Sequence, residues 1–504
     1  MLNKYVERIK NARVYDVAIK TPLDEMPRLS RRLNNSVWVK REDLQPVFSF
    51  KLRGAYNRMS YLSEQERAQG VVTASAGNHA QGVALSAKKM GISALIVMPK
   101  TTPSIKIESV RDLGAEIALH GNNYDDACRY ALNVAKQQGR TFIHPYDDEE
   151  VIAGQGTIAM EILEQHHDHI DAIFIPVGGG GLIAGMAAYI KATRPEIKVI
   201  GVEPEDAACL KAALKAGERV ELEQVGLFAD GTAVRQVGEE PFRVAQQTVD
   251  EVITVTSDEL CAGIMDIFDD TRSIAEPSGA LAVAGVKKYI EENDISDQQF
   301  VVIDSGANIN FDRLRHVAER AELGERREVL FAATISETPG SFQQFCQLLA
   351  EYSITEFNYR YADSGDAHVF VGLQLNGGDA ARQNLFDNLS DAGYQWVNFS
   401  DNEMAKLHVR HMVGGHAPQV EDERLYRFEF PERPGALLRF LTRMGERWNI
   451  SLFHYRNHGA AYGRVLVGVQ VIDKEREEFQ GFLDALGYVY WDETDNLAYN
   501  LFLK

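Results

Sequence analysis

The sequence has little cysteine and no excess of basic residues, and each absence excludes a class of protein. Its four cysteines, Cys128, Cys209, Cys261 and Cys346, are far apart in 504 residues and form no Cys-x-x-Cys pair. This spacing argues against a structural zinc site and a disulfide framework, and it favours a reducing compartment. Lysine and arginine number 53 against 73 acidic residues, a net charge of −20. We therefore expect neither nucleic acid nor an anionic membrane surface as a partner.

The sequence also lacks a long apolar run and a targeting segment. No apolar stretch approaches the roughly 20 residues that a transmembrane helix needs. The first residues show neither the apolar core of a signal peptide nor an Arg-rich transit pattern. We therefore expect a cytoplasmic protein with no membrane partner. Hydrophobic residues make up 45% of the chain, which is enough for several cores. The length of the chain, 504 residues, predicts more than one domain.

Strand and helix patterns alternate from about residue 20 to residue 320. Short apolar runs at 71–74, 94–98, 172–177 and 300–304 read as strands, and helical patterns separate them. This alternation predicts a mostly parallel sheet that helices cover on both faces. Ligands of such sheets bind outside the carboxyl ends of the strands, so a site is expected in the turns that follow them.

Lys51 is the lysine that could carry chemistry. It lies in the segment 49–55, SFKLRGA in one-letter code, shortly after a strand pattern at 37–40. Burial in this apolar setting would lower the pKa of its amine and make it a nucleophile or a base, as a Schiff-base lysine requires. Taken alone, the segment favours the alternative, a surface lysine at the start of a helix.

A run of four glycines, Gly178, Gly179, Gly180 and Gly181, separates the strand pattern at 172–177 from a helix that begins at Leu182. Successive glycines let backbone amides converge on an anion, and the helix N-terminus adds its dipole. The run matches neither a P-loop nor the G-x-G-x-x-G fingerprint, so a single phosphate is favoured over a nucleotide. A flexible turn is the alternative interpretation.

A second turn of small residues follows the strand pattern at 71–74. It consists of Ser75, Ala76, Gly77, Asn78 and His79. Its backbone amides at a helix start suit a carboxylate, and the side-chain amide of Asn78 suits a ring hydroxyl. A plain helix cap is the alternative.

Ser305 follows the strand pattern at 300–304 and supplies a hydroxyl for a ring nitrogen. The helix start at 276–279 could line the same cleft.

The run His-His-Asp-His at 166–169 looks like a metal site, but it has no second cluster to complete it. We therefore predict no metal.

Beyond about residue 325 the chain repeats itself at offsets of 95 or 96 residues. The matched segments are 331–342 with 426–437, 357–360 with 453–456, and 369–375 with 465–471. Each copy reads as strand, helix, strand, strand, helix, strand, which is the order of the ferredoxin-like fold. Neither copy contains a nucleophile–base pair, so we expect ligand sensing, with a purely oligomer-building role as the alternative.

Taken in order, the motifs S-F-K-x-R-G-A, S-A-G-N-H-A-Q-G, G-G-G-G-L and S-G-A-N resemble those of the threonine deaminases (threonine ammonia-lyases). These enzymes belong to the fold-type II pyridoxal-phosphate family, and the resemblance covers nearly the whole chain. It implies an α/β catalytic domain of two parallel-sheet lobes at 1–322 and a linker at 323–328. Two ferredoxin-like, ACT-like α+β regulatory subdomains would follow at 329–400 and 424–504, joined by a connector at 401–423.

The resemblance implies a role for each matching residue. Lys51 would hold pyridoxal 5′-phosphate as a Schiff base and act as the catalytic base. Asn78 would bond the ring hydroxyl, and Ser305 would face the pyridine nitrogen. The four glycines with Leu182 would bind the phosphate, and the turn at 75–79 would bind the substrate carboxylate.

The resemblance also implies an activity, the deamination of L-threonine to 2-oxobutanoate and ammonia, with L-serine as a second substrate. This is the first committed step of isoleucine biosynthesis, and the enzyme would be a homotetramer inhibited by isoleucine and relieved by valine. We assign effector sites to Tyr359 and Tyr455, which occupy equivalent positions in the two copies; core aromatics are the alternative. Two other functions stay open: a β-replacement enzyme of the same fold, and an amino-acid sensor with a decayed enzyme domain.

Overall fold

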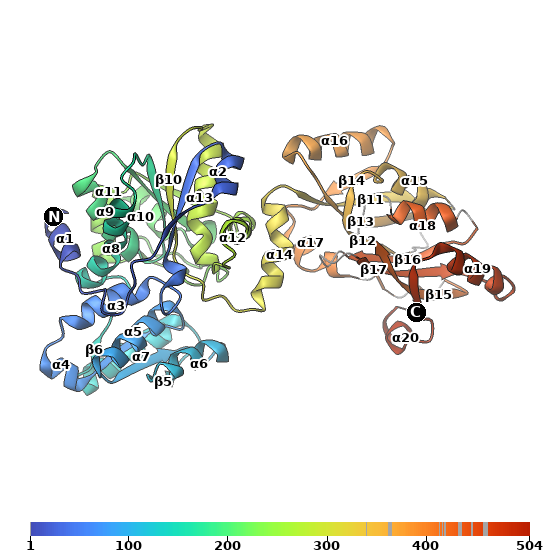
Figure 1. Cartoon of the computed structure of the whole chain (residues 1–504). Helices are drawn as coiled ribbons and strands as arrows, with labels where there is room; N and C mark the ends of the chain where they lie inside the picture. The colour runs from blue at the N-terminus through green and yellow to red at the C-terminus, as the bar shows by residue number, and fades with distance from the viewer. Residues whose placement is uncertain are drawn as a thin grey trace. The chain divides into compact units, whose positions relative to one another are not determined.

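The structure is a computed structural model. It describes residues 2–338, 340–360, 365–412, 414–415, 417, 420–431, 436–444, 447–456 and 462–503. The chain divides into two compact units, residues 1–324 and 325–504, and each unit has sheets of its own (Figure 1). Parts of the matched segments 331–342 and 426–437, and of the predicted connector 401–423, lie outside the described residues.

The first unit consists of a larger and a smaller lobe. The elements of the larger lobe are α1 (Leu2–Lys10), β1 (Leu23–Glu25), α2 (Pro27–Leu33), β2 (Ser36–Arg41), α8 (Glu149–Gln165), β7 (Ala172–Pro176), α9 (Gly181–Thr193), β8 (Lys198–Pro204), α10 (Cys209–Ala216), α11 (Glu239–Thr248), β9 (Glu251–Val255), α12 (Ser257–Thr271), α13 (Pro277–Asn293), β10 (Gln299–Asp304) and α14 (Arg313–Gly324). Those of the smaller lobe are α3 (Lys51–Ser60), α4 (Glu64–Gln69), β3 (Val71–Ala74), α5 (Asn78–Met90), β4 (Ala94–Met98), α6 (Ser104–Asp112), β5 (Glu116–Leu119), α7 (Tyr124–Gln138) and β6 (Thr141–Phe142).

The larger lobe is built on a six-stranded sheet with the order β1-β2-β10-β7-β8-β9. Its strands pair in parallel, except that β1 runs antiparallel to β2. Helices α1, α8, α9 and α11 pack against one face, and α2, α12 and α13 pack against the other (Figure 1). Because both faces are covered, strands such as β7 are buried along their whole length and read as continuous apolar runs.

The smaller lobe contains a four-stranded parallel sheet with the order β5-β4-β3-β6. Helices α3, α5 and α6 contribute to the core on one face, and α7 packs against the other. The two parallel-sheet lobes that the family resemblance implies are therefore confirmed, whereas the alternation of strands and helices alone predicted a single sheet. The carboxyl ends of β3 and β10 lead into the turns that hold Asn78 and Ser305.

The second unit contains both sequence copies in one eight-stranded sheet. Its elements are β11 (Glu328–Ser336), α15 (Ser341–Leu348), β12 (Ser353–Arg360), β13 (Asp366–Gln374), α16 (Gly378–Asp391), β14 (Gln395–Asn398), α17 (Glu403–Leu407), β15 (Glu423–Pro431), α18 (Ala436–Met444), β16 (Ile450–Arg456), β17 (Tyr462–Gln470), α19 (Arg476–Leu486), β18 (Val489–Asp492) and α20 (Leu497–Phe502).

Each copy has the predicted strand-helix-strand-strand-helix-strand order, from β11 to β14 and from β15 to β18. The sheet order is β14-β11-β13-β12-β16-β17-β15-β18, so the copies join where β12 pairs antiparallel with β16. Buried side chains from both copies form one hydrophobic core. The two copies thus share a core as well as a sheet.

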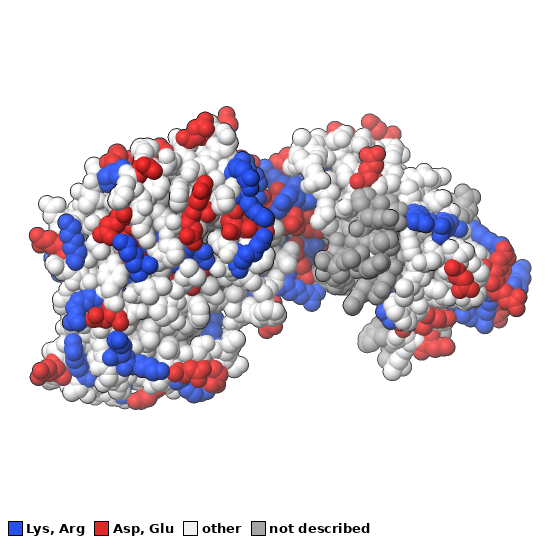
Figure 2. All heavy atoms as spheres, in the orientation of Figure 1, with Lys and Arg blue, Asp and Glu red and all other residues white. Residues whose placement is uncertain are grey.

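Acidic and basic side chains are interspersed over the face shown in Figure 2, and its described part carries no continuous basic patch. None of the helices in the described parts of the chain is both long enough and apolar enough to span a bilayer.

Candidate active site

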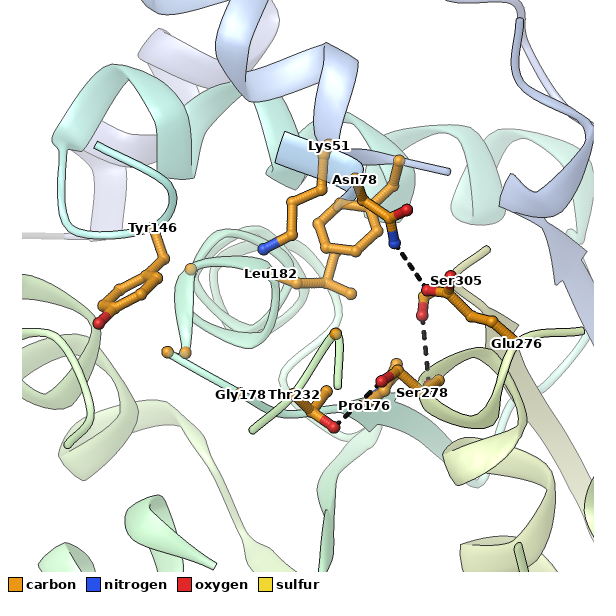
Figure 3. Close-up of a pocket in the computed structure, with 15 residues that line it drawn as sticks. Lys51, Asn78, Tyr146, Pro176, Gly178, Leu182, Thr232, Glu276, Ser278 and Ser305 are labelled. Carbon is orange, nitrogen blue, oxygen red and sulfur yellow. Dashed lines mark hydrogen bonds between the residues drawn. The ribbon is translucent and has the colours of Figure 1, made fainter. Parts of the chain in front are cut away.

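A pocket in the first unit brings most of the sequence-predicted site residues together (Figure 3). Its lining includes Lys51 and Asn78 from the smaller lobe, and the glycine run, Leu182 and Ser305 from the larger lobe. Glu276 and Ser278, from the predicted helix start at 276–279, also line it. The remaining lining residues are Phe50, Tyr146, Pro176, Gly231 and Thr232.

Lys51 is the first residue of α3, and its amine lies in this pocket (Figure 3). The Nζ atom is 5.1 Å from the centre of the Phe50 ring. Burial lowers the pKa of Lys51 to about 8, and the charge of Glu276 opposes this shift. A substantial fraction of the amine is therefore neutral, and hence nucleophilic, near pH 8.

A buried ionic cluster holds the helix that begins at Lys51. Arg53 donates from Nε to Glu42 Oε2 at 2.8 Å and from Nη1 to Glu161 Oε1 at 2.6 Å. Lys40 Nζ donates to Glu161 Oε2 at 2.6 Å. All four side chains are fully buried, so each charge depends on its partners for compensation. The cluster ties α3 to β2 and α8, and it explains the arginine two residues after Lys51.

Two glycines allow α3 and α8 to touch through their backbones. A Cβ atom at Gly54 would lie 2.7 Å from the carbonyl oxygen of Val151, and one at Gly154 would lie 2.6 Å from that of Arg53. No side chain fits at either position without moving a helix. Gly54 therefore serves the packing of the helix that carries Lys51.

The glycine run forms a cradle at the N-terminus of α9. Gly180 has a φ of 89°, which favours glycine, and a Cβ atom at Gly181 would lie 2.9 Å from the carbonyl oxygen of Tyr146. A Cβ atom at Gly179 would overlap the ring of Tyr146. The first amides of a helix have no partners within it, so the cradle offers N–H donors to an anion.

Polar groups of the pocket form a hydrogen-bonded set around Asn78, the first residue of α5. Asn78 Nδ2 donates to Glu276 Oε1 at 2.6 Å (Figure 3). Asn78 Oδ1 accepts from Asn308 Nδ2 at 2.7 Å. Ser305 Oγ donates to the carbonyl oxygen of Ser278 at 3.3 Å. Burial raises the pKa of Glu276 to about 7, and the charge of Asp230 adds to this shift.

The remaining residues of the predicted carboxylate-binding turn are not among those that line the pocket. They are Ser75, Ala76, Gly77 and His79. His79 is buried, with Nε2 3.0 Å from the carbonyl oxygen of Ile143, and burial lowers its pKa to about 3. Its imidazole is therefore neutral. A Cβ atom at Gly77 would meet no atom within 4 Å, so open space lies beside the backbone of this turn.

Sequence reasoning missed Tyr146 and Thr232. Tyr146 follows β6, whose two residues are too few to show a strand pattern. Thr232 lies in a turn that follows no strand, and its Oγ1 is 3.2 Å from Ser278 Oγ. Position after a strand was the only available signal, and it was absent or too weak in both cases.

The residues at 166–169 belong to other interactions. His166 Nε2 lies 3.1 Å from Gln299 Oε1, and His169 pairs with Asp171 at 3.0 Å. Among the described residues, no group of three or more His, Cys, Asp or Glu side chains could hold a metal ion.

The pocket fits a phosphorylated aromatic aldehyde, because it combines a lysine whose amine is partly neutral near pH 8, an anion cradle and several polar side chains. Residues 14–306 match the family of pyridoxal-phosphate dependent enzymes. Residues 319–409 and 414–503 match the C-terminal regulatory domain of threonine dehydratase. Fold, pocket and family together define a pyridoxal-phosphate dependent enzyme of fold type II with two regulatory repeats.

Similar proteins narrow this class. The chain is 57% identical over 504 residues to the L-threonine dehydratase biosynthetic IlvA of Burkholderia multivorans, covering 99% of each chain. It is 55% identical over 500 residues to the Escherichia coli protein of that name, covering 99% of this chain and 97% of the relative. The structure of threonine deaminase isoform 2 from Solanum lycopersicum aligns with a TM-score of 0.62 at 50% identity, covering 64% of this chain and 93% of that one. The chain belongs to the biosynthetic threonine dehydratase family.

Proposed function

We propose that the pocket deaminates L-threonine to 2-oxobutanoate and ammonia, the first committed step of isoleucine biosynthesis, with L-serine as a second substrate. One observation carries the proposal: an amine of lowered pKa, Lys51, shares a pocket with a glycine cradle for a single phosphate. The names of the relatives supply the substrate.

The sequence-predicted residues of the pocket would each have a role toward pyridoxal 5′-phosphate. Lys51 would hold the cofactor covalently, and the amides of Gly178–Gly181 and Leu182 would bind its phosphate. Asn78 would donate to the ring oxygen, and the hydroxyl of Ser305 would lie at the ring nitrogen. The bound cofactor supplies an electron sink for the bond that breaks at Cα.

The chain's own residues would handle the substrate and its proton. The backbone amides of the turn at 75–79, beside the open space at Gly77, would bind the substrate carboxylate. When not bonded to the cofactor, Lys51 would be a free amine with a lowered pKa. It would then take the proton from Cα as a general base. The cluster around Arg53 would keep this amine in place.

The decisive experiment incubates the purified protein with L-threonine alone and measures 2-oxobutanoate. Product without a second nucleophile excludes β-replacement, and any turnover excludes a decayed enzyme domain. The protein should show a visible absorption band that borohydride abolishes. Lys51→Ala should lack both the band and the activity, whereas Lys88→Ala, at an exposed lysine, should keep both. Wild-type protein without the band would refute the proposal.

We also propose that the second unit binds isoleucine as an inhibitor and valine as its antagonist, and that the chain forms a homotetramer. The family match to a regulatory domain supports the regulatory role. Tyr359 and Tyr455 lie on β12 and β16, opposite Phe453 and Phe357 respectively. The Tyr359 hydroxyl donates to Glu337 Oε2 at 2.8 Å. Both tyrosines thus lie where the copies join, which suits a small apolar ligand.

Both tyrosines are largely buried, at 5% and 9% exposure, so alanine would leave a cavity and disturb the core. Phenylalanine is the sharper variant, because it removes only the hydroxyl. We expect Tyr359→Phe or Tyr455→Phe to raise the isoleucine concentration for half-inhibition at least threefold with unchanged uninhibited activity. Unchanged inhibition in both would leave them as core aromatics. Light scattering of the wild-type protein tests the tetramer.

A further inference from the structure

Glu276 has an unusual place for a residue that precedes a helix. It is the N-cap of α13, yet its side chain makes no capping hydrogen bond. The side chain is instead buried, with 4% of the residue exposed, and it lines the pocket beside Asn78 (Figure 3). Helix stability alone does not explain this placement, because a cap would use the carboxylate on the first amides of α13.

Two glycines lie next to this carboxylate. A Cβ atom at Gly306 would lie 3.1 Å from Glu276 Oε1, and one at Gly231 would lie 3.4 Å from it. A side chain at Gly306 would crowd the oxygen that accepts from Asn78, whereas one at Gly231 would only touch it. The turn after β10 thus leaves room for the carboxylate.

The hydrogen bonds around Asn78 define which way its amide points. Asn308 Nδ2 donates both to the carbonyl oxygen of Val47, at 2.9 Å, and to Asn78 Oδ1, at 2.7 Å. A carboxylate can only accept, so Glu276 requires the NH₂ group of Asn78 on its side. One N–H of that group donates to Glu276, and the second can donate to a ligand in the pocket.

The carboxylate of Glu276 is close to few cations, and Lys106, which lies outside the pocket, acts on it only as a more distant charge. Asp230, its acidic neighbour, pairs with Lys106 at 2.5 Å and with Arg313 at 3.5 Å. In the described part of the chain no salt bridge joins Glu276 to a basic residue. The other charges that act on it are those of Lys51, Asp230, Lys106 and Asp304. Lys51 is the cation that shares the pocket with Glu276.

We propose that Glu276 is a positioning residue of this site. Its carboxylate holds the Asn78 amide with an N–H toward the cofactor's ring oxygen, and its charge stabilises positive charge on the nitrogen of Lys51. The inference rests on the proposed function, because it requires pyridoxal 5′-phosphate at Lys51. It adds a residue that no motif of the sequence assigns to the cofactor.

The two parts of the proposal are separated by two variants. Glu276→Gln keeps an oxygen that can accept from Asn78 but removes the charge. Glu276→Ala removes both. Glu64→Gln is the matched control, since Glu64 is an exposed acid in the first turn of α4. The measurements are the affinity of the apoenzyme for pyridoxal 5′-phosphate and the pH midpoint of the visible absorption of the holoenzyme.

We expect Glu276→Ala to weaken cofactor affinity about tenfold, as the loss of a hydrogen bond to a charged group does. Asn78→Ala should do the same, and the double variant should lose at least threefold less than the product of the two single losses. Glu276→Gln should keep the affinity within threefold and lower the pH midpoint by about one unit or more, because a nearby negative charge favours the protonated form. Glu64→Gln should match the wild type.

Independent losses in the double variant would overturn the positioning role, and an unshifted midpoint in Glu276→Gln would overturn the charge role. If Glu276→Ala does not fold, Glu276→Gln still decides the proposal through its affinity and midpoint together. A wild-type protein without a borohydride-sensitive band would instead refute the proposed function. A normal band with an unshifted Glu276→Gln midpoint refutes only this inference.

Discussion

Arg53 shows how much of the motif around Lys51 is structural. Its guanidinium is fully buried between Glu42 and Glu161, and Glu161 in turn binds Lys40. None of these four side chains lines the pocket. In the sequence Lys51 and Arg53 belong to one motif. In the structure Lys51 lines the site, whereas Arg53 holds the helix that carries it.

Arg53→Met should therefore destabilise the protein strongly. The substitution removes a charged partner from two buried carboxylates. Breaking a buried ion pair in this way lowers the free energy of unfolding by about 3–5 kcal/mol. Denaturant unfolding monitored by circular dichroism measures the change. Arg129→Met is the control: it breaks an exposed pair with Asp126, worth about 0–1 kcal/mol. Equal stability of the two variants would contradict the structural role of the cluster.

The pKa of Lys51 predicts a pH dependence for cofactor loading. The neutral amine is the nucleophile, and burial places the pKa at about 8. The rate at which apoenzyme forms the borohydride-sensitive band should rise with pH through about 8 and level off above it. Stopped-flow absorbance at constant ionic strength measures this rate. A rise centred near the ordinary lysine pKa of about 10.4 would show that the amine is not desolvated.

At the scale of elements, the crossing of α3 and α8 requires particular residues, as the pocket does. Gly54 and Gly154 face each other with no space for a methyl group on either side. Because α3 begins at Lys51, a shift of this crossing moves the amine. The packing of the two helices thus determines the position of the Lys51 amine in the pocket.

Gly154→Ala should lower both the melting temperature and the activity, since the new methyl would overlap the backbone of α3. The loss should be about 1–3 kcal/mol, as overpacking costs in a tight core. Gly481→Ala provides the contrast. Gly481 lies within α19, a Cβ atom there would meet no atom within 4 Å, and alanine should be neutral or stabilising by about 0.5–1 kcal/mol. Thermal unfolding of the two variants side by side tests the assignment.

The predictability of these elements follows from their length and burial. The strands β3 and β4 match the apolar runs at 71–74 and 94–98, because buried parallel strands leave a continuous signal. β6 leaves none in its two residues, so Tyr146 was missed. The pocket gathers Lys51, Asn78, the glycine run and Ser305, and the last three lie in turns after β3, β7 and β10, which are strands of two different sheets. Side-chain orientations such as that of His79 depend instead on contacts across the lobe.

At the scale of the whole molecule, each unit has cores of its own. Among the described residues, the main core of the second unit contains residues from 329 onward, and the cores of the first unit contain residues up to 321. The repeat predicted two ferredoxin-like copies, but it did not predict how they join. Every outer strand offers the same backbone donors and acceptors, so the pairing of β12 with β16 could not be read from residue types.

A chain that ends at residue 324 should fold and remain catalytically competent. Its cores are complete, and every residue that lines the pocket lies within it. We expect the borohydride-sensitive band and 2-oxobutanoate formation to persist while inhibition by isoleucine disappears. Activity assays with and without isoleucine, on the fragment and the full chain, measure this. A fragment still inhibited by isoleucine would place the effector site in the first unit.

The edge-to-edge union of the two copies also has a consequence for solubility. Because β12 pairs with β16, the outermost strands of the sheet are β14 and β18. Each has only four residues. Short edge strands offer little template for the addition of further strands, so the sheet resists open-ended polymerisation. The duplication therefore doubles the regulatory module without doubling the number of strand edges at which the protein could aggregate.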